Sequence, residues 1–323
     1  MRTVLAVLAL LFTASACVSG ESSGSGGTVE LRLDYAYYNP ESLVLRDKRW
    51  LEDELAGKGV EVSWVLSAGS NKANENLRAN TIDVGSTAGA AALLARANGA
   101  PIKTFYVFSQ PEWAAVVVGR DSPITSIEQL KGRKIAATKG TDPYFFLLQT
   151  LRQAGLSGSD VEVVNLQHAD GKTALERGDV DAWAGLDPLM AQSQVDAGSR
   201  LLHRDIAFNS YGVLNANEQF LKDHPDLVKA VVAGYQRARA WIGDNSGEAV
   251  SLLAKESKVS ENVAKIVLGE RTRLDVSPVP GDAQQQVLQR ILPTLVAESQ
   301  VKSEQDANTA LRTLFDPGFA SSP

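Results

Sequence analysis

Val29-Glu30-Leu31-Arg32-Leu33-Asp34-Tyr35 alternates apolar and polar residues at the start of the folded part of the chain. This alternation is typical of a β-strand. Asn39-Pro40 follows and provides an N-cap and a first-turn proline for a helix that we expect to end at Gly57. A strand, a short helix and another strand are expected over 60–66, 71–80 and 82–84. Strands that alternate with helices predict an α/β fold, with a parallel sheet and helices on its faces.

The same order of elements recurs in the middle of the chain. Strands are expected over 134–138, 161–166 and 180–184, with helices over 141–155 and 170–177 between them. Short pieces of sequence also repeat between the two halves, since Val60-Glu61-Val62 is matched by Val161-Glu162-Val163. We therefore predict two similar α/β lobes, the first formed by 29–108 and 208–323 and the second by 109–207.

The last third of the chain is predicted to be helical, with no clear strand after about residue 214. Helices are expected over 223–243, 246–255, 260–269, 281–298 and 303–315. These helices need an existing surface to pack on, and the first lobe is the simplest choice. Phe105–Phe108 and Ile206–Leu214 would then be the two crossover strands that join the lobes.

Composition limits the classes of function. The chain has 323 residues, a length typical of about two domains. Lys and Arg number 32 against 38 Asp and Glu, so the net charge of −6 argues against nucleic-acid binding. One Cys excludes a disulfide framework and a Cys-rich metal site, and three dispersed His exclude an HExxH centre. No P-loop or dinucleotide glycine signature occurs, so we expect no metal and no cofactor.

The N-terminus indicates export. Arg2 precedes an unbroken apolar run from Val4 to Phe12, which is typical of a signal peptide and too short to span a bilayer. Ala14-Ser15-Ala16-Cys17 resembles a bacterial lipobox, so we expect residues 1–16 to be removed and Cys17 to be lipidated. The alternative is ordinary cleavage after Ala16 with a free thiol. Residues 17–28 then form the lipidated Cys and a flexible Gly/Ser linker, on a protein anchored outside the cytoplasm.

Two facing lobes place two sets of loops around one cleft, because ligands of open parallel sheets bind beyond the carboxyl ends of the strands. The first set is 35–39, 67–71 and 86–90, and the second is 139–142, 168–170 and 185–188. Many residues in these loops are small, so backbone amides can approach a ligand closely. Several loops lead into expected helices, whose N-termini provide free N–H groups and partial positive charge. The pattern predicts a site for a small anion.

Several blocks of sequence carry a resemblance to a known family. They are Ser86–Gly89, Asp121–Ile124, Leu130–Ala136, Lys139–Thr141 and Glu176–Pro188. Over residues 29–245 the chain resembles the periplasmic substrate-binding proteins of ABC importers, in particular the group for aliphatic sulfonates, taurine and nitrate. The resemblance implies a type II periplasmic-binding fold, in which the lobes close on a ligand and the closed form docks on a membrane permease. The chain departs from the pattern at Ala90-Ala91-Ala92, where many sulfonate binders carry an acid and a proline.

The residues that we expect to contact the ligand lie in these loops or at nearby strand ends. They are Tyr35, Tyr37, Ser67, Gly69, Ser86, Thr87, Ala88, Gly89, Lys139, Gly140, Thr141, Asp142, His168, Trp183 and Asp187.

Each of these positions also has a structural interpretation. The tyrosines and Trp183 suit core packing, and His168 suits a surface or capping position. Thr141 and Asp187 suit N-caps. Asp142 is a first-turn acid favoured by the helix dipole, or it pairs with the amine of an aminosulfonate such as taurine.

The sequence therefore predicts a receptor rather than an enzyme. Its ligand is expected to be an aliphatic sulfonate or a taurine-like anion, and its partner a membrane permease. A monomer is expected. The alternatives are a receptor of the same fold for nitrate or for an aromatic or pyrimidine compound, and an enzyme like the pyrimidine-forming enzyme of the thiamine pathway. A sensory module would need a receptor fusion or a transmembrane helix, and we expect neither.

Overall fold

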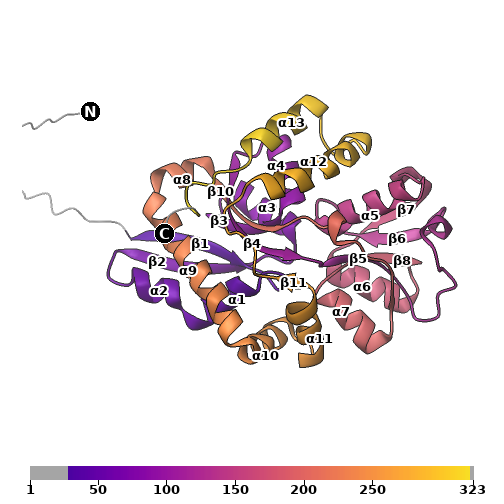
Figure 1. The fold of residues 1–323 in the computed structure, drawn as a ribbon, viewed down its shortest axis with the longest axis horizontal. Helices are drawn as coiled ribbons and strands as arrows, with labels where there is room; N and C mark the ends of the chain where they lie inside the picture. Colours follow the sequence, from indigo (N-terminus) through magenta and orange to yellow (C-terminus); the bar gives the residue numbers. More distant parts are fainter. Residues whose placement is uncertain (1–27, 321–323) are drawn as a thin grey trace, which may run out of the picture.

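The computed structural model describes residues 28–320 and contains two separate mixed β-sheets (Figure 1). The predicted signal peptide, Cys17 and nearly all of the linker lie outside the described residues. We call the six-stranded sheet and its helices lobe 1, and the five-stranded sheet and its helices lobe 2. The α/β two-lobe architecture confirms the predicted fold class. The residue limits given above for each lobe stay a prediction.

The sheet of lobe 1 has the strand order β11-β4-β10-β3-β1-β2. Its strands are β1 (Val29–Tyr35), β2 (Val60–Leu66), β3 (Val84–Ala88), β4 (Ile102–Pro111), β10 (Gly212–Asn217) and β11 (Thr272–Arg273). The first three strands run parallel, as predicted, and Val29 is in register with Val60. The expectation of a wholly parallel sheet was wrong, because β10 returns from lobe 2 and pairs antiparallel with both β3 and β4.

The sheet of lobe 2 has the strand order β7-β6-β8-β5-β9. Its strands are β5 (Ala114–Val118), β6 (Lys134–Ala137), β7 (Glu162–Asn165), β8 (Ala182–Leu186) and β9 (Arg200–His203). The three strands predicted here form its parallel part. Sequence reasoning missed β5 and β9, which run antiparallel to the rest.

The chain passes between the sheets twice. It leaves β4 at Pro111 and enters β5 at Ala114, and it returns between β9 and β10. Phe105–Phe108 therefore lie inside lobe 1, within β4, rather than between the lobes. An ion pair of 2.6 Å between Glu112 and Arg204 joins the two crossover segments.

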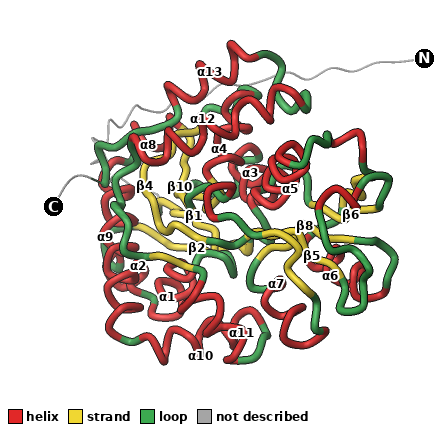
Figure 2. Tube along the Cα trace, turned by 45° about the vertical axis from the view of Figure 1, so that its right-hand side comes forward, coloured by secondary structure: helices red, strands yellow, loops and turns green. Residues whose placement is uncertain are grey.

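The helices cover the faces of both sheets (Figures 1 and 2). The helix expected from Pro40 to Gly57 is two helices, because Arg49 adopts a left-handed conformation with a φ of 55°. The helices of the first two thirds of the chain are α1 (Pro40–Lys48), α2 (Trp50–Leu55), α3 (Ser70–Arg78), α4 (Gly89–Ala97), α5 (Asp142–Gln153), α6 (His168–Arg177) and α7 (Leu189–Gln192).

The C-terminal helices pack on lobe 1, as predicted, and they also reach lobe 2. They are α8 (Glu218–Asp223), α9 (Pro225–Asp244), α10 (Ser246–Ser257), α11 (Glu261–Lys265), α12 (Asp282–Ala297) and α13 (Glu304–Thr313). Helix α9 lies against α1, and α12 lies against both α4 and α5. The expectation of no strand after residue 214 was wrong, since β11 pairs with the end of β4. Within residues 28–320, no helix combines the length and apolar character that a membrane span requires.

Candidate functional site

Three helices from the two lobes begin at one place. Helix α3 of lobe 1 begins after Gly69, and helices α5 and α6 of lobe 2 begin after Thr141 and Gln167. A Cβ atom built on Gly69 would lie 3.0 Å from Nε2 of His168, and one built on Gly140 would lie 3.9 Å from the Cβ of Asn71. The helix starts of both lobes therefore face each other across the cleft.

None of these three helix starts is capped by a side chain of its N-cap residue. Thr141 is the N-cap residue of α5, but its hydroxyl donates backwards to the carbonyl oxygen of Thr138, at 2.6 Å. An uncapped helix N-terminus offers N–H donors and a partial positive charge. The junction therefore suits an anion, which is the chemistry that Gly69, Gly140 and Thr141 were predicted to provide.

Several polar atoms at this junction are buried without a hydrogen-bond partner in the described part of the chain. They are Oδ1 of Asn71, Oε1 of Gln167 and Nε2 of His168. The hydroxyl of Ser67 instead interacts with Asp34 and opposes the rise in the pKa of that carboxyl, so a ligand contact at Ser67 stays a prediction. A buried polar atom left unpaired costs about 1–3 kcal/mol. Such a cluster requires hydrogen-bond partners from outside the chain, for which ordered water and a bound ligand are the candidates.

His168 is the first residue of α6 rather than part of a loop, and it is only 2% exposed. The Thr138 hydroxyl donates to the carbonyl oxygen of Leu166 at 2.7 Å and lies 3.2 Å from Nδ1 of His168. Because that hydroxyl has one hydrogen, Nδ1 must be the donor in the second contact. Burial lowers the pKa of His168 to about 3, so the ring is neutral and Nε2 carries a lone pair.

Gly69→Ala is expected to weaken anion binding by about tenfold or more. The backbone of Gly69 has a φ of 154°, and a Cβ there would lie 2.8 Å from Oδ1 of Asn71. The start of α3 and the facing His168 ring would have to move apart, and such overpacking costs about 1–3 kcal/mol. Calorimetric titration checks this against Gly243→Ala, whose Cβ would meet no atom within 4 Å. Equal affinity in both variants would contradict the placement of the site.

The turn Ser86–Gly89 has internal partners instead of facing the junction. Both N–H and Oγ of Ser86 donate to Oδ1 of Asp34, at 2.8 and 2.7 Å. The N–H of Ala88 donates to Oγ of Ser70, and that of Gly89 to the carbonyl oxygen of Tyr211. Thr87 accepts from the side chain of Asn215. These bonds hold the start of α4 against the second crossover, and a ligand contact here stays a prediction.

Asp34 beneath this turn gives the protein an expected pH dependence. Burial raises the pKa of Asp34 to about 7, although the hydrogen bonds from Ser86 oppose the rise. The folded state therefore binds this proton more tightly than the unfolded state, in which the pKa is about 4. The resulting stability is complete below about pH 4 and is lost as the pH rises through about 7. The free energy of unfolding, measured with urea between about pH 4 and 7, should fall less steeply with pH in Asp34→Asn than in the wild type. The same dependence on pH in both proteins would contradict the role of Asp34.

The carboxylate of Asp142 is buried and is occupied by donors of the protein, so it is not free to pair with the amine of a ligand. Its carboxylate accepts from Nε1 of Trp113 at 2.8 Å and from N–H and Oγ of Ser210 at 2.8 and 2.7 Å. Burial raises the pKa of Asp142, and these hydrogen bonds oppose the rise. Trp113 belongs to the first crossover and Ser210 to the second, so Asp142 ties the start of α5 to both.

Asp187 forms an ion pair that joins the lobes. Its carboxylate lies 3.1 Å from Nη1 of Arg271, and the two residues are 2% and 5% exposed. Asp187 also accepts from the N–H of Ala191, but the N-cap residue of α7 is Pro188 rather than the expected Asp187. Arg271 precedes β11 of lobe 1 and donates to Gln194 of lobe 2 as well. Sequence reasoning missed Arg271, because it lies 84 residues from its partner, between the expected helices 260–269 and 281–298.

The aromatic residues singled out from the sequence pack against neighbouring parts of the protein. Trp183 is fully buried in the core of lobe 2, where a Cβ on Gly171 would lie 2.8 Å from its Nε1. The ring of Tyr35 lies 4.0 Å beneath the Arg46 guanidinium. Tyr37 borders a cavity of about 10 Å³ between the lobes. Packing therefore explains Tyr35. Nε1 of Trp183 is buried without a partner among the described residues, so a ligand contact at Trp183 stays a prediction.

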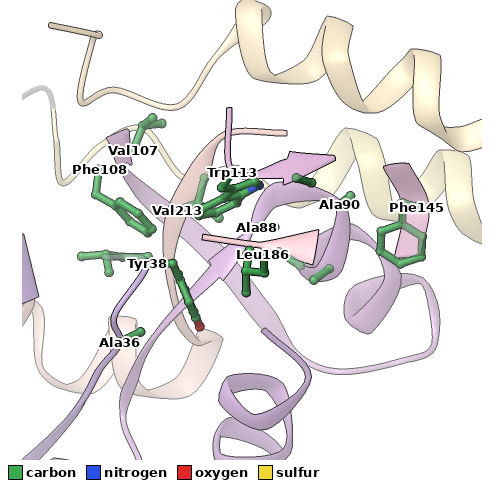
Figure 3. Close-up of a cluster of buried hydrophobic side chains, with 14 of the residues drawn as sticks. Ala36, Tyr38, Ala88, Ala90, Val107, Phe108, Trp113, Phe145, Leu186 and Val213 are labelled. Atoms are coloured by element: carbon green, nitrogen blue, oxygen red, sulfur yellow. The ribbon is translucent and has the colours of Figure 1, made fainter. Parts of the chain in front are cut away.

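Two other aromatic residues lie between the lobes (Figure 3). The rings of Tyr38 and Trp113 meet edge to face, with centroids 5.7 Å apart. Ala88 of lobe 1 and Leu186 of lobe 2 belong to the same buried cluster. Lys139, by contrast, is exposed, and its backbone N–H donates to the side chain of Asn165.

Comparisons with known proteins agree with this architecture. The family described as NMT1/THI5 like matches residues 52–249. A protein of Escherichia coli (strain K12) named for aliphatic sulfonate binding is 29% identical over 283 residues, which cover 86% of this chain and 87% of the relative. A similarly named protein of Bacillus subtilis (strain 168) is 28% identical and covers 82% of each chain.

Solved structures show the same fold. The alkanesulfonate-binding protein SsuA of Xanthomonas axonopodis pv. citri, bound to MOPS, superposes with a TM-score of 0.78 at 23% identity, covering 88% of this chain and 98% of that one. The desulfurization enzyme DszB has this fold too, with a TM-score of 0.65 at 18% identity, covering 90% of this chain and 97% of that one. The family match spans more than half of the sequence, and this chain therefore belongs to the NMT1/THI5-like family of periplasmic binding proteins.

Proposed function

We propose that the protein is the solute-binding component of an ABC importer and that its solute is an aliphatic sulfonate or a taurine-like anion. The observation that carries this proposal is the meeting of three uncapped helix starts, from both lobes, at Gly69, Gly140 and His168. Backbone N–H groups and helix dipoles stabilise an anion without a cluster of basic side chains.

Binding would proceed by closure of the lobes. A ligand held by α3 of lobe 1 and by α5 and α6 of lobe 2 makes all of its contacts only when the lobes are together. Such a ligand shifts the population towards the closed state. The closed surface would then be recognised by a membrane permease, and the N-terminal lipid at Cys17 would keep the receptor outside the cytoplasm and close to that permease.

A thermal-shift panel on residues 18–323 tests the proposal. The panel contains alkanesulfonates of two to eight carbons, taurine, nitrate and hydroxymethylpyrimidine. A ligand at about 100 times its dissociation constant adds about 2.7 kcal/mol of stability and raises the melting temperature. We expect the sulfonates to produce this shift. A shift with nitrate or the pyrimidine alone would replace the ligand and keep the receptor, and turnover of any compound would favour an enzyme.

A further inference from the structure

We propose, resting on the function proposed above, that the site selects a sulfonate with an ammonium group near its anionic head, and that Nε2 of His168 accepts a hydrogen bond from that group. The ligand class is then an aminosulfonate, and His168 is the residue that distinguishes it from a plain alkanesulfonate.

The hydrogen bonds of Thr138 determine which ring nitrogen of His168 carries the proton. Nδ1 of the ring must donate to Thr138, because the single Thr138 hydrogen goes to the carbonyl oxygen of Leu166. A neutral ring with its proton on Nδ1 presents a lone pair at Nε2. This atom is buried and has no partner among the described residues, and it faces the start of α3 across the cleft.

A second acceptor borders the same point. Oδ1 of Asn71 and Nε2 of His168 lie 2.8 and 3.0 Å from the position that a Cβ on Gly69 would occupy. Oδ1 of Asn71 is also buried without a partner. Two acceptors from opposite lobes therefore meet beside the helix starts, and one ammonium group has enough hydrogens for both.

A plain sulfonate does not satisfy these atoms. Its oxygens are acceptors only, so they pair with the helix N–H groups but repel a lone pair on Nε2. The other route, in which His168 gains a proton and becomes a donor, is opposed by complete burial of the ring, which lowers its pKa to about 3. No charged group contributes to that shift. A ligand with N–H donors satisfies the lone pair and needs no proton transfer.

Taurine and propane-1-sulfonate form the matched pair of probes, since they differ by an ammonium in place of a methyl group. We expect calorimetric titration of the wild-type protein to show taurine binding about ten- to a hundredfold more tightly, the range for one hydrogen bond to a charged group. Titration in two buffers of different ionisation heat should show no net proton uptake at neutral pH. Equal affinities, or uptake of one proton with propane-1-sulfonate, would overturn the inference.

Two substitutions assign the preference to His168. His168→Phe keeps a ring and removes the acceptor, so the preference for taurine over propane-1-sulfonate is expected to disappear. If that variant does not fold, Thr138→Val removes the acceptor of the Nδ1 proton and frees the tautomer, and it should reduce the preference. Thr138→Ser keeps the hydroxyl and should behave as wild type. A preference that is unchanged in both His168→Phe and Thr138→Val would reject the role of His168.

Nitrogen NMR of the imidazole rings gives an independent readout. We expect one of the three histidines, identified by its absence in His168→Phe or by its change in Thr138→Val, to carry its proton on Nδ1 in the free protein. A proton on Nε2 would overturn the inference and leave the proposed function standing. If neither taurine nor propane-1-sulfonate binds, the proposed function itself fails.

Discussion

Replacing Asp142 with alanine is expected to lower the free energy of unfolding by about 3 kcal/mol or more. The substitution leaves Nε1 of Trp113 and the N–H of Ser210 buried without an acceptor. Each such orphaned donor costs about 1–3 kcal/mol. It also frees the start of α5 from both crossover segments, so the midpoint of urea unfolding should fall.

Asp142→Asn is the matched control. Its amide oxygen still accepts from Trp113 and Ser210, and the Ser210 hydroxyl is able to turn and accept from the amide nitrogen. We expect it to lose about 1 kcal/mol. Equal stability of Asp142→Ala and Asp142→Asn would show that the carboxylate does not tie the crossovers to α5.

Arg271→Met is expected to open the lobes rather than to unfold them. It leaves the Asp187 carboxylate buried without a counter-ion, and breaking such a pair from one side costs about 3–5 kcal/mol. Because the pair joins the lobes, the closed state is destabilised, and ligand affinity should fall by about a hundredfold or more. Small-angle scattering should show a larger radius of gyration in the presence of ligand.

The loss of lobe closure and of ligand affinity in Arg271→Met is expected to become smaller as the pH falls. Burial raises the pKa of Asp187 and Arg271 opposes the rise, so removal of Arg271 makes the carboxylate easier to protonate. A neutral Asp187 no longer needs a counter-ion. The double variant Arg271→Met with Asp187→Leu should restore much of the closure at neutral pH. If Arg271→Met alone closes at neutral pH as fully as the wild type does, the pair does not hold the lobes together.

Much of the fold was predictable because local patterns and global structure agree. The alternation in Val29–Tyr35 gives β1, and Asn39 caps α1 by accepting from the N–H of Ser42, at 3.2 Å. β5 escaped prediction because Ala114–Val118 is a short, continuously apolar run, in which periodicity does not separate a strand from a buried helix. Its partners β8 and β9 lie far along the chain, and antiparallel pairing across a crossover leaves no local signal.

The candidate site was only partly predictable for the same reason. The strand-end rule located Gly69, Gly140 and Thr141, which depend on local turns. The partners of Asp142 and Asp187 are set by where the crossovers and the C-terminal segment arrive, and residue spacing does not encode this. Trp183 was assigned to the cleft because it lies near a strand end, but its side chain points to the opposite face of β8, since alternate residues of a strand face opposite ways.

Asp142 attaches the first turn of α5 to both crossover segments. If lobe motion bends the chain where it passes between the sheets, the rotation axis runs beside the first turn of α5. Points near an axis travel little, whereas distant points sweep through long arcs. A guest seated at that turn would stay almost stationary during opening, while the far rim of each lobe swings widely. Ligand release would thus depend on how far the outer edges of the lobes separate, and the bound ligand would not have to move with either lobe.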